Sequence, residues 1–97
     1  MEILIQSIKF DATEKLQEFI QKKMKKLERF HDGITTIEVT LKVVKPETSE
    51  NKEASVKLTA PHMELFASKV ADSFEEAVDL CSEAIQKQIE KAKEKKQ

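Results

Sequence analysis

Four segments of the chain carry the hydrophobic pattern of β-strands. Residues 2–10 open with a cluster of apolar side chains, and residues 54–60 alternate apolar with polar side chains. The clearest alternation lies within residues 34–45, where polar residues separate Ile37, Val39, Leu41 and Val43. Residues 65–71 alternate more weakly. Because successive side chains of a strand point to opposite faces, these segments predict four strands, each with one apolar face.

Two longer segments have the three- and four-residue apolar spacing of amphipathic helices. The first begins with the start signal of Asp11 and Glu14 and runs to about Phe30. It is followed by Gly33, the only glycine, at a place where a helix end often needs a left-handed residue. The second spans residues 73–97, where a capping-box pair precedes an apolar face made of Phe74, Val78, Cys81, Ile85, Ile89 and Ala92.

The order of the elements is β-α-β-β-β-α, which predicts an α+β fold with two layers. A helix between the first two strands favours parallel, right-handed pairing, and the later strands favour an antiparallel meander. We therefore expect a four-stranded mixed sheet with two parallel helices on one face and a polar, hydrated opposite face. The 97 residues suit a single domain, residues 1–97, with residues 86–97 as the lysine-rich end of the last helix.

The formal net charge of −1 conceals a very uneven distribution of charge along the chain. Residues 15–30 hold six basic and two acidic side chains, a net charge of +4, and residues 86–97 hold five lysines and two acids, a net charge of +3. The rest of the chain carries −8. Because both basic segments end helices that are expected to lie parallel, their basic ends should fall together on one rigid surface.

Such a surface favours binding to structured RNA, which is recognised mainly through its shape and its phosphate backbone. The sequence has no Tyr or Trp on which single-stranded bases could stack, so we do not expect a single-strand reader. The alternative is that the lysines form solvated helix faces that also suit the negative end of the helix dipole. The pattern by itself leaves both interpretations open.

Few residues could carry other chemistry. Cys81 lies on the apolar face of the second helix, which is typical of a core cysteine and not of a thiolate nucleophile. His31, Asp32 and His62 lie in two separate predicted turns without metal-ligand spacing. No nucleotide-binding or hydrolase motif occurs. We therefore expect no enzyme activity, no metal, no cofactor and no small-molecule substrate.

The chain also carries no sign of export or membrane insertion. No apolar run approaches the ~20 residues that span a bilayer, and the N-terminus has no signal-peptide pattern. A single cysteine excludes an internal disulfide and fits a reducing compartment. These features predict a cytoplasmic protein without a membrane partner.

The element order and two segments resemble the ribosome hibernation promoting factor family, also called the ribosome-associated inhibitor or sigma-54 modulation protein family. The segments are Lys22-Lys-Met-Lys-Lys-Leu-Glu-Arg-Phe30 at the end of the first helix and Phe74-Glu-Glu-Ala-Val-Asp79 at the start of the second. The family's second helix continues with a basic pattern, which is matched here by Lys87-Gln88, Lys91 and Lys93. Ala84 and Glu90 stand where family members often have a base. The resemblance covers essentially the whole chain and is to the short form of the family.

The resemblance implies a non-enzymatic protein that binds 16S ribosomal RNA in the decoding channel of the small ribosomal subunit. There it would sterically block messenger RNA and the A- and P-site tRNAs, and so inhibit translation in stationary phase or stress. We expect a monomer when the protein is free. The alternative is a protein-interaction regulator, such as a sigma-54-type transcription modulator, that acts through the exposed sheet face. The predicted rRNA-binding residues are Lys22, Lys23, Lys26, Arg29, Lys87, Gln88, Lys91, Lys93 and Lys95.

Overall fold

The computed structural model describes residues 1–44 and 50–94, apart from the side chains of residues 93 and 94. Residues 46–49 of the predicted loop and the predicted contact Lys95 lie outside the described residues. The elements are β1 (Glu2–Ile8), α1 (Glu14–Lys25), the 3-10 helix η1 (Lys26–Arg29), β2 (Thr36–Val43), β3 (Lys52–Ala60), β4 (Met63–Ala71) and α2 (Phe74–Glu94). This order confirms the predicted β-α-β-β-β-α fold.

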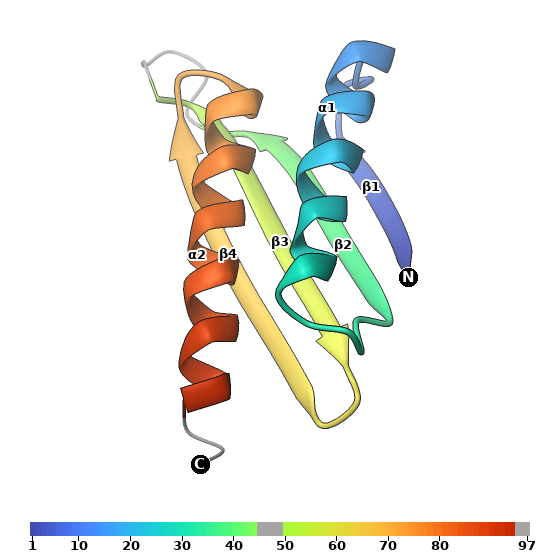
Figure 1. The fold of residues 1–97 in the computed structure, drawn as a ribbon. Coiled ribbons are helices and arrows are strands. Elements are labelled where there is room, and N and C mark those ends of the chain that lie inside the picture. The colour runs from blue at the N-terminus through green and yellow to red at the C-terminus, as the bar shows by residue number, and fades with distance from the viewer. Residues whose placement is uncertain (45–49, 95–97) are drawn as a thin grey trace.

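The four strands form one sheet in the order β1-β2-β3-β4. β1 pairs with β2 in parallel, with Ile3 opposite Ile37, and the other two strand pairs are antiparallel. Both helices cover the same face of the sheet and run in the same direction, α1 over β1 and β2, and α2 over β3 and β4 (Figure 1). The mixed sheet and the parallel pair of helices are therefore confirmed.

The core lies between the sheet and the helices and is made of the apolar faces that the sequence predicts. The strands contribute alternating side chains such as Val56 and Leu58, and the helices contribute Ile20, Met24 and Ile85, all of them fully buried. No polar or charged side chain is buried within residues 1–44 and 50–92. Burial of apolar surface, at about 25 cal/mol per Å², is therefore the main attraction between the two layers.

Side-chain caps set the start of each helix. The Thr13 hydroxyl accepts a hydrogen bond from the backbone N–H of Leu16 at 3.1 Å, so Thr13 caps α1 in place of the predicted Asp11. α2 starts where the sequence predicts, because the Ser73 hydroxyl accepts from the N–H of Glu76 at 3.1 Å. Both caps satisfy N–H groups that have no partner inside the helix.

Gly33 lacks the left-handed backbone that was expected after the first helix, since its φ is not positive. The helix instead tightens into η1 and ends at Phe30, whose backbone stays right-handed. The backbone N–H of Gly33 donates to Nδ1 of His31 at 3.0 Å. A Cβ at this position would lie 3.1 Å from Cε1 of His31. The small size of Gly33 therefore leaves room for the imidazole ring to fold back over the turn.

The sheet face without helices is less polar than predicted. Leu4 and Phe66 lie on it with exposures of 44% and 59%. The strand register places them in one row across the sheet, separated by Glu38 and Lys57. A hollow of about 290 Å³ lies over this row. The face therefore combines hydrated polar side chains with exposed apolar ones.

Cys81 is a core residue, as its position in the apolar pattern predicts. Its side chain is fully buried, and the thiol donates to the carbonyl oxygen of Ala54 on β3 at 3.2 Å. Desolvation by this burial raises the pKa of the Cys81 thiol to about 11. A thiol that stays protonated and has no access to solvent is unsuited to nucleophilic catalysis.

The raised pKa of Cys81 predicts that the protein loses stability in mild alkali. Between about pH 9 and 11 the unfolded thiol ionises while the folded one stays protonated, so the folded state binds more protons and stability falls as pH rises. The loss from this group should reach about 2–3 kcal/mol by pH 11. Urea unfolding at several pH values measures it. The variant Cys81→Ala should show a smaller decline over the same range, and parallel curves would contradict the prediction.

Candidate nucleic-acid interface

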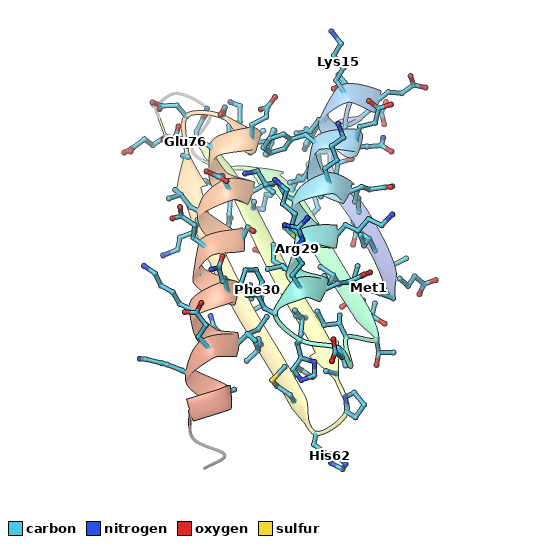
Figure 2. All side chains as sticks on the ribbon, in the orientation of Figure 1. Met1, Lys15, Arg29, Phe30, His62 and Glu76 are labelled. Atoms are coloured by element: carbon cyan, nitrogen blue, oxygen red, sulfur yellow. The ribbon has the colours of Figure 1, made fainter. Side chains whose placement is uncertain are left out.

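Three basic side chains form a stripe on the solvent side of the first helical segment. Lys22, Lys26 and Arg29 are all exposed, whereas the apolar residues on the opposite side of the segment are buried against the sheet. At about 100° per residue, Lys22 and Lys26 lie about 40° apart around the helix axis. Arg29 follows in η1, and in Figure 2 its side chain lies between the two helical segments. We call these three residues the basic stripe.

A hollow of about 380 Å³ accompanies the basic stripe. Its lining residues are Lys22, Lys25, Lys26, Glu28 and Arg29. Four cations against one carboxylate give this surface a net positive charge on a rigid helical support. Such a surface attracts phosphate groups, and the attraction weakens as salt concentration rises.

Lys23 makes a contact between the two helices. Its Nζ lies 2.6 Å from Oδ1 of Asp79 on α2 and 5.7 Å from the centre of the Phe19 ring. The two charged side chains are 29% and 48% exposed, so the ion pair stabilises the fold by no more than about 1 kcal/mol. Asp79 balances much of the charge of Lys23 and holds it beside α2. In this structure Lys23 joins the two helices. A contact between Lys23 and RNA stays a prediction.

The described lysines of α2 project away from α1. Asp79 marks the side of α2 that faces α1, and the helical repeat places Lys87 about 80° and Lys91 about 120° further round the axis. Both side chains are exposed. Glu90 and Glu83 lie about 20° and 40° from Asp79, so the flank of α2 beside α1 is acidic. This arrangement differs from a uniformly positive groove between the helices.

Gln88 reaches the sheet edge. Its Nε2 donates to the carbonyl oxygen of Phe66 on β4 at 2.9 Å. Because β4 is the edge strand of the sheet, this bond fastens α2 over that edge. The side-chain amide therefore has a partner within the protein before any RNA approaches.

The nine predicted binding residues fall into separate groups. The basic stripe is one surface, and Lys87 with Lys91 is a second. Lys23 and Gln88 make contacts within the fold. The side chain of Lys93 and the whole of Lys95 lie outside the described part of the chain. The parallel helices do direct both basic ends toward the same end of the molecule (Figure 1). Lys87 lines a hollow with Glu83, Gln86 and Glu90, so two carboxylates lie beside it on α2.

A second cavity, which we call the η1 hollow, opens where η1 ends. It has a volume of about 390 Å³ and is lined by Arg29, Phe30, His31, Asp32, Gly33, Met63, Ile89 and Ala92. β4 and α2 supply apolar residues, and residues 29–33 supply the polar side chains together with the ring of Phe30. Sequence reasoning assigned His31 and Asp32 only to a turn. Nothing in the sequence indicates that residues of β4 and α2 complete a cavity around them.

Other kinds of site find no support in the part of the chain that the structure describes. Within residues 1–44 and 50–94, no group of three His, Cys, Asp or Glu side chains is placed to hold a metal ion. None of the helices in these ranges is long and apolar enough to cross a membrane. The basic stripe, the exposed lysines of α2, the η1 hollow and the hollow over Leu4 and Phe66 are thus the features of the described residues that bear on function.

Comparison with protein families matches residues 3–97 to the family described as Sigma 54 modulation protein / S30EA ribosomal protein. Curated relatives are similar over nearly their whole length. The ribosome hibernation promoting factor of Azotobacter vinelandii is 29% identical over 100 residues, which cover 98% of this chain and 85% of that protein. The factor of the same name from Pseudomonas putida is 27% identical over 97 residues, which cover 100% of this chain and 91% of that protein.

Two solved structures share the fold. A ribosomal subunit interface protein from Coxiella burnetii superposes with a TM-score of 0.86 at 22% identity, covering 96% of this chain and 98% of that one. The N-terminal domain of Thermus thermophilus Protein Y gives a TM-score of 0.79 at 17% identity, with coverage of 94% and 98%. These structures establish the two-layer α+β architecture independently of sequence identity.

Proposed function

The chain belongs to the Sigma 54 modulation protein / S30EA ribosomal protein family of non-enzymatic ribosome hibernation factors, and from this premise we propose how it acts. It binds the small ribosomal subunit in the decoding channel and contacts 16S ribosomal RNA. Its bulk excludes messenger RNA and the A- and P-site tRNAs, so translation stops in stationary phase or under stress. The protein acts in the cytoplasm and is a monomer when free.

The basic stripe is the observation that carries this proposal. Lys22, Lys26 and Arg29 are exposed, lie on one side of a helical segment and line a common hollow with Lys25. The buried face of α1 fixes that segment on the sheet, so the cations are held in place before RNA binds. Contacts of this kind position a protein on phosphates without reading sequence.

The lysines of α2 form the second contact in the proposal. Lys87 and Lys91 face outward from α2, where they can meet phosphates that the basic stripe does not reach. Lys93 and Lys95 follow them in the sequence and are proposed as further contacts. Glu83 and Glu90 line a hollow with Lys87, so they weaken the attraction of this part of α2 for phosphates. The basic stripe is therefore the stronger of the two contacts in the proposal.

Co-sedimentation with purified 70S ribosomes and with separated subunits, across a salt series, tests the proposal. We expect retention on 70S ribosomes and small subunits, with affinity falling steeply as salt rises because phosphate contacts release counterions. Prebound tRNA and messenger RNA should compete. Failure to sediment with either particle at low salt would overturn the proposal. If prebound tRNA and messenger RNA do not reduce binding, the protein does not bind in the decoding channel, but binding to the ribosome itself would still stand.

A second candidate function is a protein contact through the open sheet face. The observation that favours it is the pair of exposed apolar side chains Leu4 and Phe66 over one hollow. Such a contact predicts binding to a protein partner that survives reversal of the basic stripe and is lost on Phe66→Ser. If the Phe66→Ser variant still binds ribosomes and the variant with a reversed basic stripe does not, then the RNA interface is the correct one.

A further inference from the structure

We propose that the η1 hollow receives one unstacked base of the RNA to which the protein binds, an inference that rests on the proposed function. The hollow is bounded by the end of η1, the 31–33 turn, the start of β4 and the last described turns of α2. With a volume of about 390 Å³, the hollow has room for one base. It therefore adds a contact with a base to a surface that otherwise meets only phosphates.

Arg29 connects the hollow to the phosphate-binding surface. Its side chain lines both the hollow beside the basic stripe and the η1 hollow. A nucleotide whose phosphate pairs with this guanidinium has its base within reach of the η1 hollow. Arg29 and Phe30 both line the η1 hollow, and in Figure 2 both side chains lie between the helical segments.

The inner surface of the hollow suits the flat face of a base. Phe30 is half-buried and supplies an aromatic ring, while Met63, Ile89 and Ala92 supply apolar contact from two other elements. Bases that leave a helical stack are commonly held on aromatic rings or guanidinium planes. Stacking of this kind contributes about 1–3 kcal/mol per base. An open lysine surface offers no equivalent contact.

The polar edge of the hollow offers one donor and one acceptor. Nδ1 of His31 accepts the Gly33 N–H, so in the neutral imidazole the proton lies on Nε2, which can donate. The exposed carboxylate of Asp32 can only accept when ionised. Adenine, cytosine and uracil each present a donor next to an acceptor, so this polar edge can hold any of the three bases. The larger ring system of adenine stacks over more of the Phe30 ring, and we therefore expect adenine to bind better than uracil.

Nucleotide titration of the free protein tests the hollow directly. With adenosine monophosphate at millimolar concentration, backbone NMR shifts should change at Phe30, Gly33 and Met63, and uridine monophosphate should give weaker changes. Inorganic phosphate is the control for an anion contact alone. The variant Phe30→Leu, which keeps an apolar side chain but removes the ring, should weaken adenosine monophosphate binding about fivefold or more. The matched control is Phe19→Leu, a half-buried aromatic of α1 that does not line the hollow.

Two results would overturn the base site. One is that inorganic phosphate reproduces the shifts, and the other is that Phe30→Leu binds adenosine monophosphate as the wild type does. On ribosomes, chemical probing of 16S RNA should show one unpaired base that the wild type protects and Phe30→Leu leaves reactive. Adenosine monophosphate binding without ribosome binding would retain the site and refute the proposed function. Ribosome binding with identical protection by wild type and Phe30→Leu would refute the site and retain the function.

Discussion

The double variant Lys22→Glu, Lys26→Glu should bind ribosomes about 100-fold more weakly than the wild type, or worse, while folding normally. Each lysine is proposed to pair with a phosphate, and a hydrogen bond to a charged group contributes about 1.5–3 kcal/mol. Replacing each lysine with glutamate also introduces a negative charge that repels the phosphate. Both side chains are exposed, Lys22 on α1 and Lys26 at the start of η1, and neither belongs to the buried core, so the fold should be unaffected.

The measurement is co-sedimentation with 70S ribosomes at several salt concentrations, with circular dichroism as the check on folding. The slope of log affinity against log salt should decrease by about two, one for each lost phosphate contact. The matched control is Lys9→Glu, Lys42→Glu, which changes the net charge equally but away from the helices. Equal loss of binding in both variants would mean that overall charge, and not the basic stripe, controls affinity.

Truncating Ile20 to Ala should destabilise the domain by about 2–5 kcal/mol. Ile20 is fully buried at the centre of the apolar face of α1 and is one of the side chains that hold this helix on the sheet. A domain of this size has a total stability of about 5–15 kcal/mol, so the variant should lose a large part of it. Because the basic stripe lies on α1 and on η1, which continues it, ribosome binding should fall as the unfolded fraction rises.

Urea unfolding followed by circular dichroism measures this loss. Ile20→Val removes one methylene group from the same side chain and should cost only about 0.5–1.5 kcal/mol. A shift of the midpoint without a change in slope would show that stability changed and that the unfolded state did not. If Ile20→Ala were as stable as Ile20→Val, then packing under α1 would not be the contact that holds the basic stripe in place.

Much of the fold follows from the sequence because its determinants are local. The alternation of Ile37, Val39 and Leu41 decides which face of β2 is buried, and the same rule places Cys81 in the core. A strand with one apolar face and a helix with one apolar side can bury both only against each other. The order of elements then restricts the topology, since a helical crossover makes the first two strands parallel. Three features differed from the prediction: the cap at Thr13, the backbone of Gly33, and the exposed apolar side chains on the open sheet face.

The candidate site is less predictable from the sequence. A charge pattern shows which side chains are exposed, but it does not show which side chains from different elements come into contact. The stripe of Lys22, Lys26 and Arg29 could be read directly, since its members share one side of a single helical segment. Lys23 looked equivalent to them in the sequence. Its partner Asp79 lies 56 positions away, and only the packing of α1 against α2 brings them within 2.6 Å.

The sequence by itself determined the layers, the buried faces, the strand order and the basic stripe, because each depends on periodicity within one element or on the order of neighbouring elements. The tertiary structure alone decided how the helices are rotated against each other. That rotation brings Lys23 to Asp79 and closes the η1 hollow with residues from β4 and α2. The rotation results from the simultaneous packing of many side chains from distant segments, and no local pattern encodes it.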